Sequence, residues 1–147
     1  MKVLIVDDSP QDLMFAQEML EKSIHLSTSK KGFCKVAGSI DEFSKHINET
    51  EFDFILLDLN LPDSEGLETV TTVDEIKRIS SLNSHTPIIV LTGTDDYAIA
   101  KKAINAGAKD YLIKGEYDEK QLERAVRFAT YSRRNPKRGG WLKRKLA

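Results

Sequence analysis

Five short apolar runs alternate along the chain with longer segments that have helical periodicity. The runs occupy Val3–Val6, Phe33–Ala37, Phe54–Leu57, Ile88–Leu91 and Tyr111–Ile113. Several of them contain no regular polar alternation, which is typical of strands that are buried on both faces of a parallel sheet. We therefore interpret the five runs as five parallel strands.

The segment after each run carries signals for helix boundaries. Ser9 precedes a proline, which favours a helix start, and Ser39 with Glu42 has the spacing of a capping box. Asp118 is a candidate cap of the last helix, and Gly107 lies where a helix C-terminal glycine is expected. Five such β-α units predict an α/β fold: a doubly wound, five-stranded parallel sheet with right-handed crossovers and helices on both faces.

Polar side chains stand at the carboxyl ends of four of the predicted strands. The first run ends in Asp7 and Asp8, the third in Asp58, the fourth in Thr92 and the fifth in Lys114. In an open α/β sheet, ligands bind beyond the carboxyl ends of the strands. Three carboxylates, a hydroxyl and an ammonium group are therefore expected to meet at one edge of the sheet.

This combination points to phosphoryl chemistry. Carboxylates that are forced together need a shared proton or a cation, and oxygen ligands with room for water suit Mg²⁺. Lys114 supplies a positive charge for a phosphoryl group, and the Thr92 hydroxyl can donate to a phosphoryl oxygen. Taken alone, each residue has an ordinary explanation as a turn, cap or solvated residue. The prediction depends on their joint placement.

Four segments closely resemble the signature segments of response-regulator receiver domains. They read VDDSP, LLDLNLPDSEG, VLTGT and GAKDYLIKG, and the resemblance covers about residues 2–130. It implies a flavodoxin-like fold with strand order 2-1-3-4-5. It also implies a two-component phosphorelay protein that takes a phosphoryl group from a histidine kinase or a histidine phosphotransfer protein.

The resemblance implies a role for each residue at the site. Asp58 resembles the phosphoacceptor, and Lys114 resembles the lysine that pairs with the phosphoryl group. Asp8 resembles the direct Mg²⁺ ligand and Asp7 a ligand that acts largely through water. The backbone carbonyl of Asn60 is the expected third protein ligand.

Two more residues resemble parts of a conformational switch. Thr92 resembles the hydroxyl that moves toward the phosphate, and Tyr111 the aromatic side chain that changes between exposed and buried positions. The resemblance implies that the face made by the fourth helix, fifth strand and fifth helix then binds an effector protein, which the sequence does not identify. The chain departs from the family at Gly115, where a proline, often after a cis bond, usually follows the lysine.

Other functions compete with the receiver interpretation. A dehalogenase-like aspartyl-phosphate phosphatase also uses Mg²⁺ and a strand-end aspartate, but it needs a second aspartate two residues later, where this chain has Asn60. A nucleotide-binding module would need a glycine-rich loop after the first strand. A scaffold without phosphorylation and a receiver fragment of a larger multidomain regulator are further alternatives. We expect no enzyme beyond catalysis of its own phosphorylation and autodephosphorylation.

The 147 residues fit one domain, predicted at 1–132, with a basic tail at 133–147. The tail holds seven of the 22 Lys and Arg residues and no acid, so the rest of the chain is acidic. We expect the tail to be a solvated terminus or a protein-docking element, which could join two copies of the chain as a homodimer. We do not expect nucleic acid as a partner, because the platform is too small for specific recognition. Residues 22–32 are predicted to lengthen the first helix and then form a polar loop. No membrane-spanning run or signal peptide is visible, and the single cysteine, Cys34, allows no intrachain disulfide, so a cytoplasmic location is expected.

Overall fold

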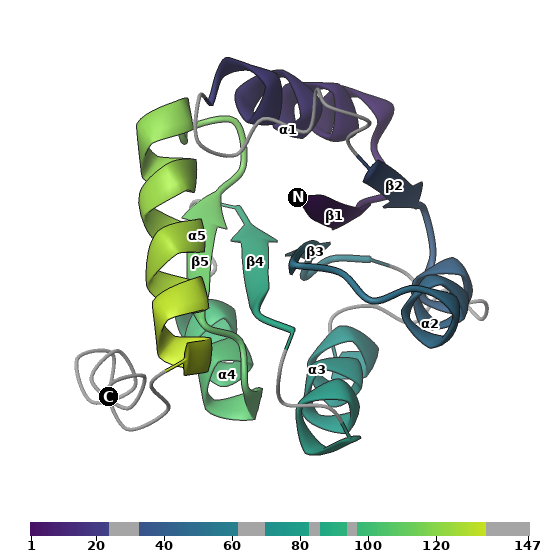
Figure 1. Cartoon of the computed structure of the whole chain (residues 1–147). Helices are drawn as coiled ribbons and strands as arrows, with labels where there is room; N and C mark the ends of the chain where they lie inside the picture. The colour runs from purple at the N-terminus through teal and green to yellow at the C-terminus, as the bar shows by residue number, and fades with distance from the viewer. Residues whose placement is uncertain (24–32, 62–69, 83–85, 94–96, 135–147) are drawn as a thin grey trace.

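The computed structural model describes residues 1–23, 33–61, 70–82, 86–93 and 97–134 (Figure 1). Strands and helices alternate through this part of the chain. The strands are β1 (Lys2–Val6), β2 (Phe33–Ala37), β3 (Phe54–Asp58), β4 (Ile88–Thr92) and β5 (Asp110–Ile113). The helices are α1 (Pro10–Lys22), α2 (Ile40–Glu49), α3 (Val70–Leu82), α4 (Tyr97–Ala106) and α5 (Glu119–Arg134).

The five strands form one parallel sheet in the order β2-β1-β3-β4-β5, so the predicted doubly wound topology is confirmed. The order reverses after β2, which places β1 and β3 side by side at the centre. Ligands of such sheets bind at this reversal, beyond the carboxyl ends of the central strands. Asp7 and Asp8 follow β1 and Asp58 ends β3, whereas Thr92 ends β4 and Lys114 follows β5.

Helices cover both faces of the sheet (Figure 1). Because successive side chains in a strand point to opposite faces, each strand contributes to two apolar clusters. Val3 and Ile5 of β1 belong to the cluster that contains α1 and α5, whereas Leu4 and Val6 belong to the cluster that contains α2, α3 and α4. These fully buried side chains explain why the strand runs lack polar alternation.

The predicted helix starts are confirmed, with one difference in detail. The Ser9 side chain caps α1 by accepting from the Asp12 backbone N–H, and Asp118 forms a reciprocal pair with Gln121 at the start of α5. Ser39 accepts from the Glu42 N–H, but the Glu42 carboxylate accepts from the N–H of residue 38 instead of the cap's own. The Glu42 carboxylate of this capping box therefore binds the residue before the cap, one position earlier than in the usual motif.

The helix ends are partly as predicted. After α4, Gly107 has φ +127° and its N–H donates to the Ile104 carbonyl, while the next N–H donates to Ala103. This is the hydrogen-bond pattern of a Schellman motif, which favours glycine. The prediction that the first helix continues past Lys22 is wrong, because α1 ends at that residue. The rest of the predicted extension and polar loop, residues 24–32, lies outside the described part.

The predicted tail falls mostly outside the described residues. Helix α5 continues through Arg134, so the first two residues of the basic segment are helical, and residues 135–147 are not described. Among the described residues, no helix is long and apolar enough to cross a membrane.

Candidate functional site

The strand register explains how residues far apart in sequence reach one place. Val6 pairs with Leu57, so Asp7 and Asp58 occupy neighbouring positions just beyond that pair. Thr92 in turn pairs with Ile113, the residue before Lys114. The carboxyl ends of four strands therefore lie along one edge, as the sequence predicted.

Lys114 is the electrostatic centre of this edge. Its Nζ lies 2.9 Å from Asp58 Oδ2, 3.0 Å from Asp12 Oδ2 and 3.2 Å from Asp7 Oδ2. Burial alone would lower the pKa of Lys114, but the contacts with Asp58, Asp12 and Asp7 outweigh it, so the pKa is raised. The lysine is therefore a permanent cation at neutral pH.

Asp7 is completely buried and its charge is poorly compensated. Oδ1 accepts the backbone N–H of Ser9 at 2.9 Å. Oδ2 is attracted to the Lys114 ammonium but has no hydrogen-bond donor among the described residues. Burial, reinforced by the Asp58 charge, raises the pKa of Asp7 from 3.8 to about 6. An oxygen in this state is a strong candidate for a cation ligand.

Asp58 ends β3 with its carboxylate held at both oxygens. The backbone N–H of Asn60 donates to Oδ1 at 2.9 Å, and the ammonium of Lys114 lies beside Oδ2. The side chain is almost completely buried, yet it stands where the strand ends and the chain turns. These contacts fix the orientation of a carboxylate that can act as a nucleophile.

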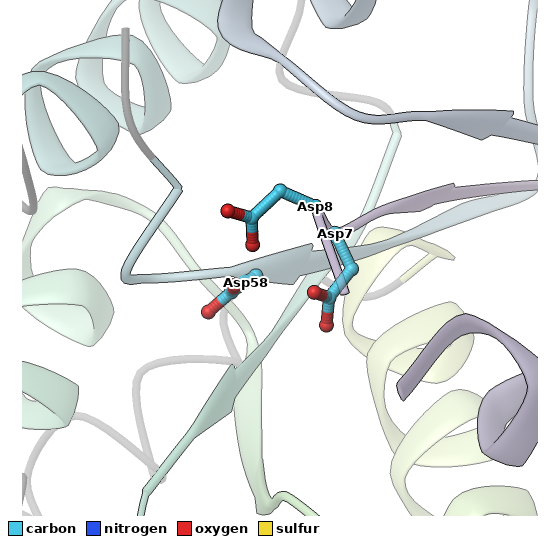
Figure 2. Close-up of side chains that lie close together, drawn as sticks. All are labelled: Asp7, Asp8 and Asp58. Atoms are coloured by element: carbon cyan, nitrogen blue, oxygen red, sulfur yellow. The ribbon is translucent and has the colours of Figure 1, made fainter. Parts of the chain in front are cut away.

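The carboxylates of Asp7, Asp8 and Asp58 together fit a small divalent cation. Each offers an oxygen that lies within 4.8 Å of the others, with Asp8 exposed and the other two buried (Figure 2). Ligands on opposite sides of Mg²⁺ are about 4.2 Å apart, so the cluster has the size of a site with some ligands bound through water. The Oδ2 of Asp7, which has no hydrogen-bond donor among the described residues, also fits this requirement. The hard oxygen donors favour Mg²⁺ over thiophilic metals.

Thr92 and Tyr111 lie on the other side of the sheet edge from the ion pairs. Val90 pairs with Tyr111, and both belong to the apolar cluster on the α2-α3-α4 side of the sheet. Thr92 lies two residues after Val90 in the same strand, so its side chain points to that side as well. Thr92 is buried, and its hydroxyl has a long 3.4 Å hydrogen bond to the Gly93 carbonyl. Tyr111 is half-buried against the apolar cluster. The long hydrogen bond of the Thr92 hydroxyl is a weak one, so little is lost when the hydroxyl takes another partner.

The glycine that departs from the family pattern has a local explanation. The Glu116 N–H donates to the Ile113 carbonyl at 3.1 Å, closing a turn in which Gly115 has φ +73°. Proline is fixed near −65° and cannot take this conformation, whereas glycine takes it readily. No peptide bond in the described part of the chain is cis. The loop after β5 thus presents Lys114 through a glycine turn.

Sequence reasoning missed two residues at the site. Asp12, in the first turn of α1, contacts Lys114, and Tyr117 is buried nearby with its ring edge-to-face against Phe15. Burial, together with the Asp12 and Asp7 charges, raises the pKa of Tyr117. The available signal was the position of Asp12, four residues after Asp8 on a helix that begins at the same edge.

Comparisons with known proteins agree with this geometry. A family model described as the response regulator receiver domain matches residues 3–127. The cell cycle transcriptional regulator CtrA of Caulobacter vibrioides is 30% identical over 125 residues, which are 84% of this chain and 48% of that protein. The chain spans about half the length of the first curated relatives it matches.

Solved structures show the same fold. NtrX from Brucella abortus superposes with a TM-score of 0.73 at 20% identity, over 96% of this chain and 29% of that one. A CheY-like receiver domain protein from Methanospirillum hungatei JF-1 superposes with a TM-score of 0.70 at 21% identity, over 92% and 97%.

Proposed function

Because the chain belongs to the response-regulator receiver domain family of two-component systems, we propose that it is switched by phosphorylation of Asp58. The phosphoryl group would come from a phosphohistidine on a histidine kinase or a histidine phosphotransfer protein. The observation that carries the proposal is the Lys114 ammonium 2.9 Å from Asp58 Oδ2, beside the buried carboxylate of Asp7.

The proposed reaction is a single phosphoryl transfer. A carboxylate oxygen of Asp58 forms a bond to the donor phosphorus as the bond from phosphorus to the donor imidazole breaks, and the imidazole nitrogen takes a proton. Asn60 N–H keeps the carboxylate oriented, and Lys114 neutralises charge on the phosphoryl oxygens. Such reactions depend mostly on positioning and charge compensation.

We propose Mg²⁺ as the cofactor, held by Asp7, Asp8, Asp58 and the backbone carbonyl of Asn60. Bound there, it would neutralise part of the negative charge that the carboxylates and the phosphoryl group bring together. The proposal is supported by the spacing of the three carboxylates and by the hydrogen-bond-free Oδ2 of Asp7.

The proposed output is a change on the face formed by α4, β5 and α5. A phosphoryl group adds a charge of about −1.5 to −2. Thr92 would turn toward it, and Tyr111, now half-buried, would move further inward. This is a shift between populated conformations, and the altered face would bind an effector protein or a second copy of the chain.

A dehalogenase-like phosphatase is the alternative that shares most of this chemistry. Its second acid would stand at Asn60, whose amide cannot exchange a proton in the way a carboxyl group does. We therefore propose that the protein modifies only itself. Repeated hydrolysis of p-nitrophenyl phosphate, beyond one equivalent per chain, would favour the phosphatase instead.

The decisive experiment is phosphorylation by acetyl phosphate in the presence of Mg²⁺, followed by intact-mass measurement. We expect one added phosphoryl group on the wild type, none on Asp58→Asn, and none when Mg²⁺ is chelated. Asp74→Asn, which removes an exposed carboxylate on α3, is the matched control and should be labelled normally. Wild-type labelling of Asp58→Asn would show that the phosphoacceptor is another residue.

A further inference from the structure

Asp12 makes a contact that the proposed reaction does not use. An ammonium group has three N–H donors, and the Nζ of Lys114 is surrounded by three carboxylates, from Asp58, Asp12 and Asp7. Asp58 is the proposed acceptor and Asp7 a proposed metal ligand. The third carboxylate has neither role, although it lies as close to the lysine as the other two.

The position of Asp12 is fixed by its surroundings on both sides. Its backbone N–H bonds to the Ser9 cap, which places the residue in the first turn of α1. One turn later, Phe15 packs edge-to-face on Tyr117 with ring centroids 5.0 Å apart, which joins α1 to the segment after β5. Because the backbone of α1 is held against the loop that presents Lys114, the ion pair needs little extra ordering.

Strand alternation gives Asp12 access to the lysine. Asp7, Asp58 and Lys114 continue the alternation of Ile5, Leu56 and Leu112, which all belong to the cluster on the α1-α5 side. Helix α1 covers this side of the sheet (Figure 1). An acidic residue in its first turn therefore meets the lysine that must also meet the phosphoryl group.

Resting on the proposed function, we propose that Asp12 is a positioning residue that restrains Lys114 in the unphosphorylated state and competes with the incoming phosphoryl group for its ammonium. A phosphoryl oxygen can accept a hydrogen bond from the Lys114 ammonium only when one of the three carboxylates gives up its contact. Asp58 Oδ2 and the buried Asp7 are held in place by the site itself, whereas the Asp12 side chain is 34% exposed and can turn to solvent. Asp12 thus sets a threshold for phosphorylation.

Removal of the Asp12 carboxylate should therefore speed phosphorylation. An ion pair that is partly open to water contributes modestly, so we expect a rate increase of roughly two- to fivefold with acetyl phosphate. Steady-state occupancy of the acyl phosphate should rise as well. Asp12→Ala preserves the backbone N–H that bonds to Ser9, and it leaves the proposed metal ligands in place.

The test compares Asp12→Ala and Asp12→Glu with the wild type by intact mass during labelling. Asp12→Glu restores the charge and should return the rate toward that of the wild type. Glu18→Ala removes an exposed carboxylate further along α1, where it pairs only with Lys22 in the salt bridges of the described residues, and should have no effect. The rate increase of Asp12→Ala should persist at roughly 0.5 M salt. Salt screens the direct contact between Asp12 and Lys114 less than it screens long-range repulsion between Asp12 and the phosphodonor.

A second measurement addresses Lys114 without metal or phosphodonor. In the metal-free protein, nitrogen-15 NMR should show faster hydrogen exchange of the Lys114 ammonium in Asp12→Ala than in the wild type. Equal or slower labelling of Asp12→Ala would overturn the inference, and so would an equal increase in Glu18→Ala. A wild type that takes up no phosphoryl group would instead overturn the proposed function, and the inference with it.

Discussion

Asp7 should make the metal-free protein less stable as the pH rises. Its side chain is fully buried, and one oxygen has no hydrogen-bond donor among the described residues. Burial, with the nearby Asp58 charge, raises the pKa of Asp7 to about 6, from an ordinary value of 3.8. Replacing Asp7 with asparagine removes this titration while the amide oxygen can still accept the Ser9 N–H.

Proton linkage gives the direction and the size of this change in the free energy of unfolding. Between pH 3.8 and about 6, the folded protein holds the Asp7 proton more tightly than the unfolded chain does. The free energy of unfolding contributed by this group is therefore fully present below pH 4 and is lost as the pH rises through about 6. A shift of this size corresponds to a loss on the order of 2–3 kcal/mol.

Denaturant unfolding with a chelator present, from about pH 4 to 8, measures this loss. The informative quantity is the stability of Asp7→Asn minus that of the wild type, because the other titrating groups cancel in the difference. We expect the difference to grow by roughly 2–3 kcal/mol up to about pH 7 and then level off. Asp74→Asn, at an exposed position on α3, should give a nearly flat difference.

Mg²⁺ should reverse the effect at neutral pH. A ligand that binds only the folded state adds about 2.7 kcal/mol when its concentration is 100 times the Kd, and wild type should gain more than Asp7→Asn. A pH-independent difference between the two proteins would refute the reasoning. So would a variant that is less stable than the wild type at pH 7 without metal.

Three further predictions concern the metal, the fold and the switch. Asp8→Ala should weaken Mg²⁺ binding in calorimetric titration far more than Asp7→Ala, and equal losses would contradict direct ligation by Asp8. Gly107→Ala should lower the free energy of unfolding by about 2 kcal/mol or more, because φ is +127° and the new methyl group would overlap a side chain of α3. Gly38→Ala, where a Cβ meets only ordinary contacts, should change stability much less. Beryllofluoride with Mg²⁺ should shift NMR signals around Tyr111, and unchanged signals there would refute the proposed switch.

The fold could be predicted because its strands bury both faces. A run such as Phe54–Leu57 has no polar residue to place toward water, and its short length between polar segments favours a parallel strand that is buried on both faces. Where the sequence pattern was weaker, it predicted that a helix was present but not where the helix ends. The helix expected to continue past Lys22 ends there, since nothing in the sequence distinguished a helical extension from a loop.

The site could be predicted as far as strand ends reveal it. Asp7, Asp58 and Lys114 each follow an apolar run, so topology alone brings them to one edge. Asp12 could not be predicted in this way, because a helical acid near an N-terminus is usually explained by the helix dipole. Its contact with Lys114 depends on how α1 packs beside the loop after β5, for example through Phe15 and Tyr117, and such packing is a tertiary property.

The same arrangement explains why the resting site should be responsive. Among the described residues, four carboxylates, from Asp7, Asp8, Asp12 and Asp58, gather at this edge with one ammonium, that of Lys114, so negative charge exceeds positive charge there. Folding holds this imbalance in place, because β1 and β3 are locked by the sheet and α1 is packed against it. In the proposed function, a divalent cation would relieve the imbalance, and a phosphoryl group would then need the lysine. If the charges of the site were balanced without ligands, neither the cation nor the phosphoryl group would be attracted strongly. Little free energy of binding would then be available for the proposed movement of Thr92 and Tyr111.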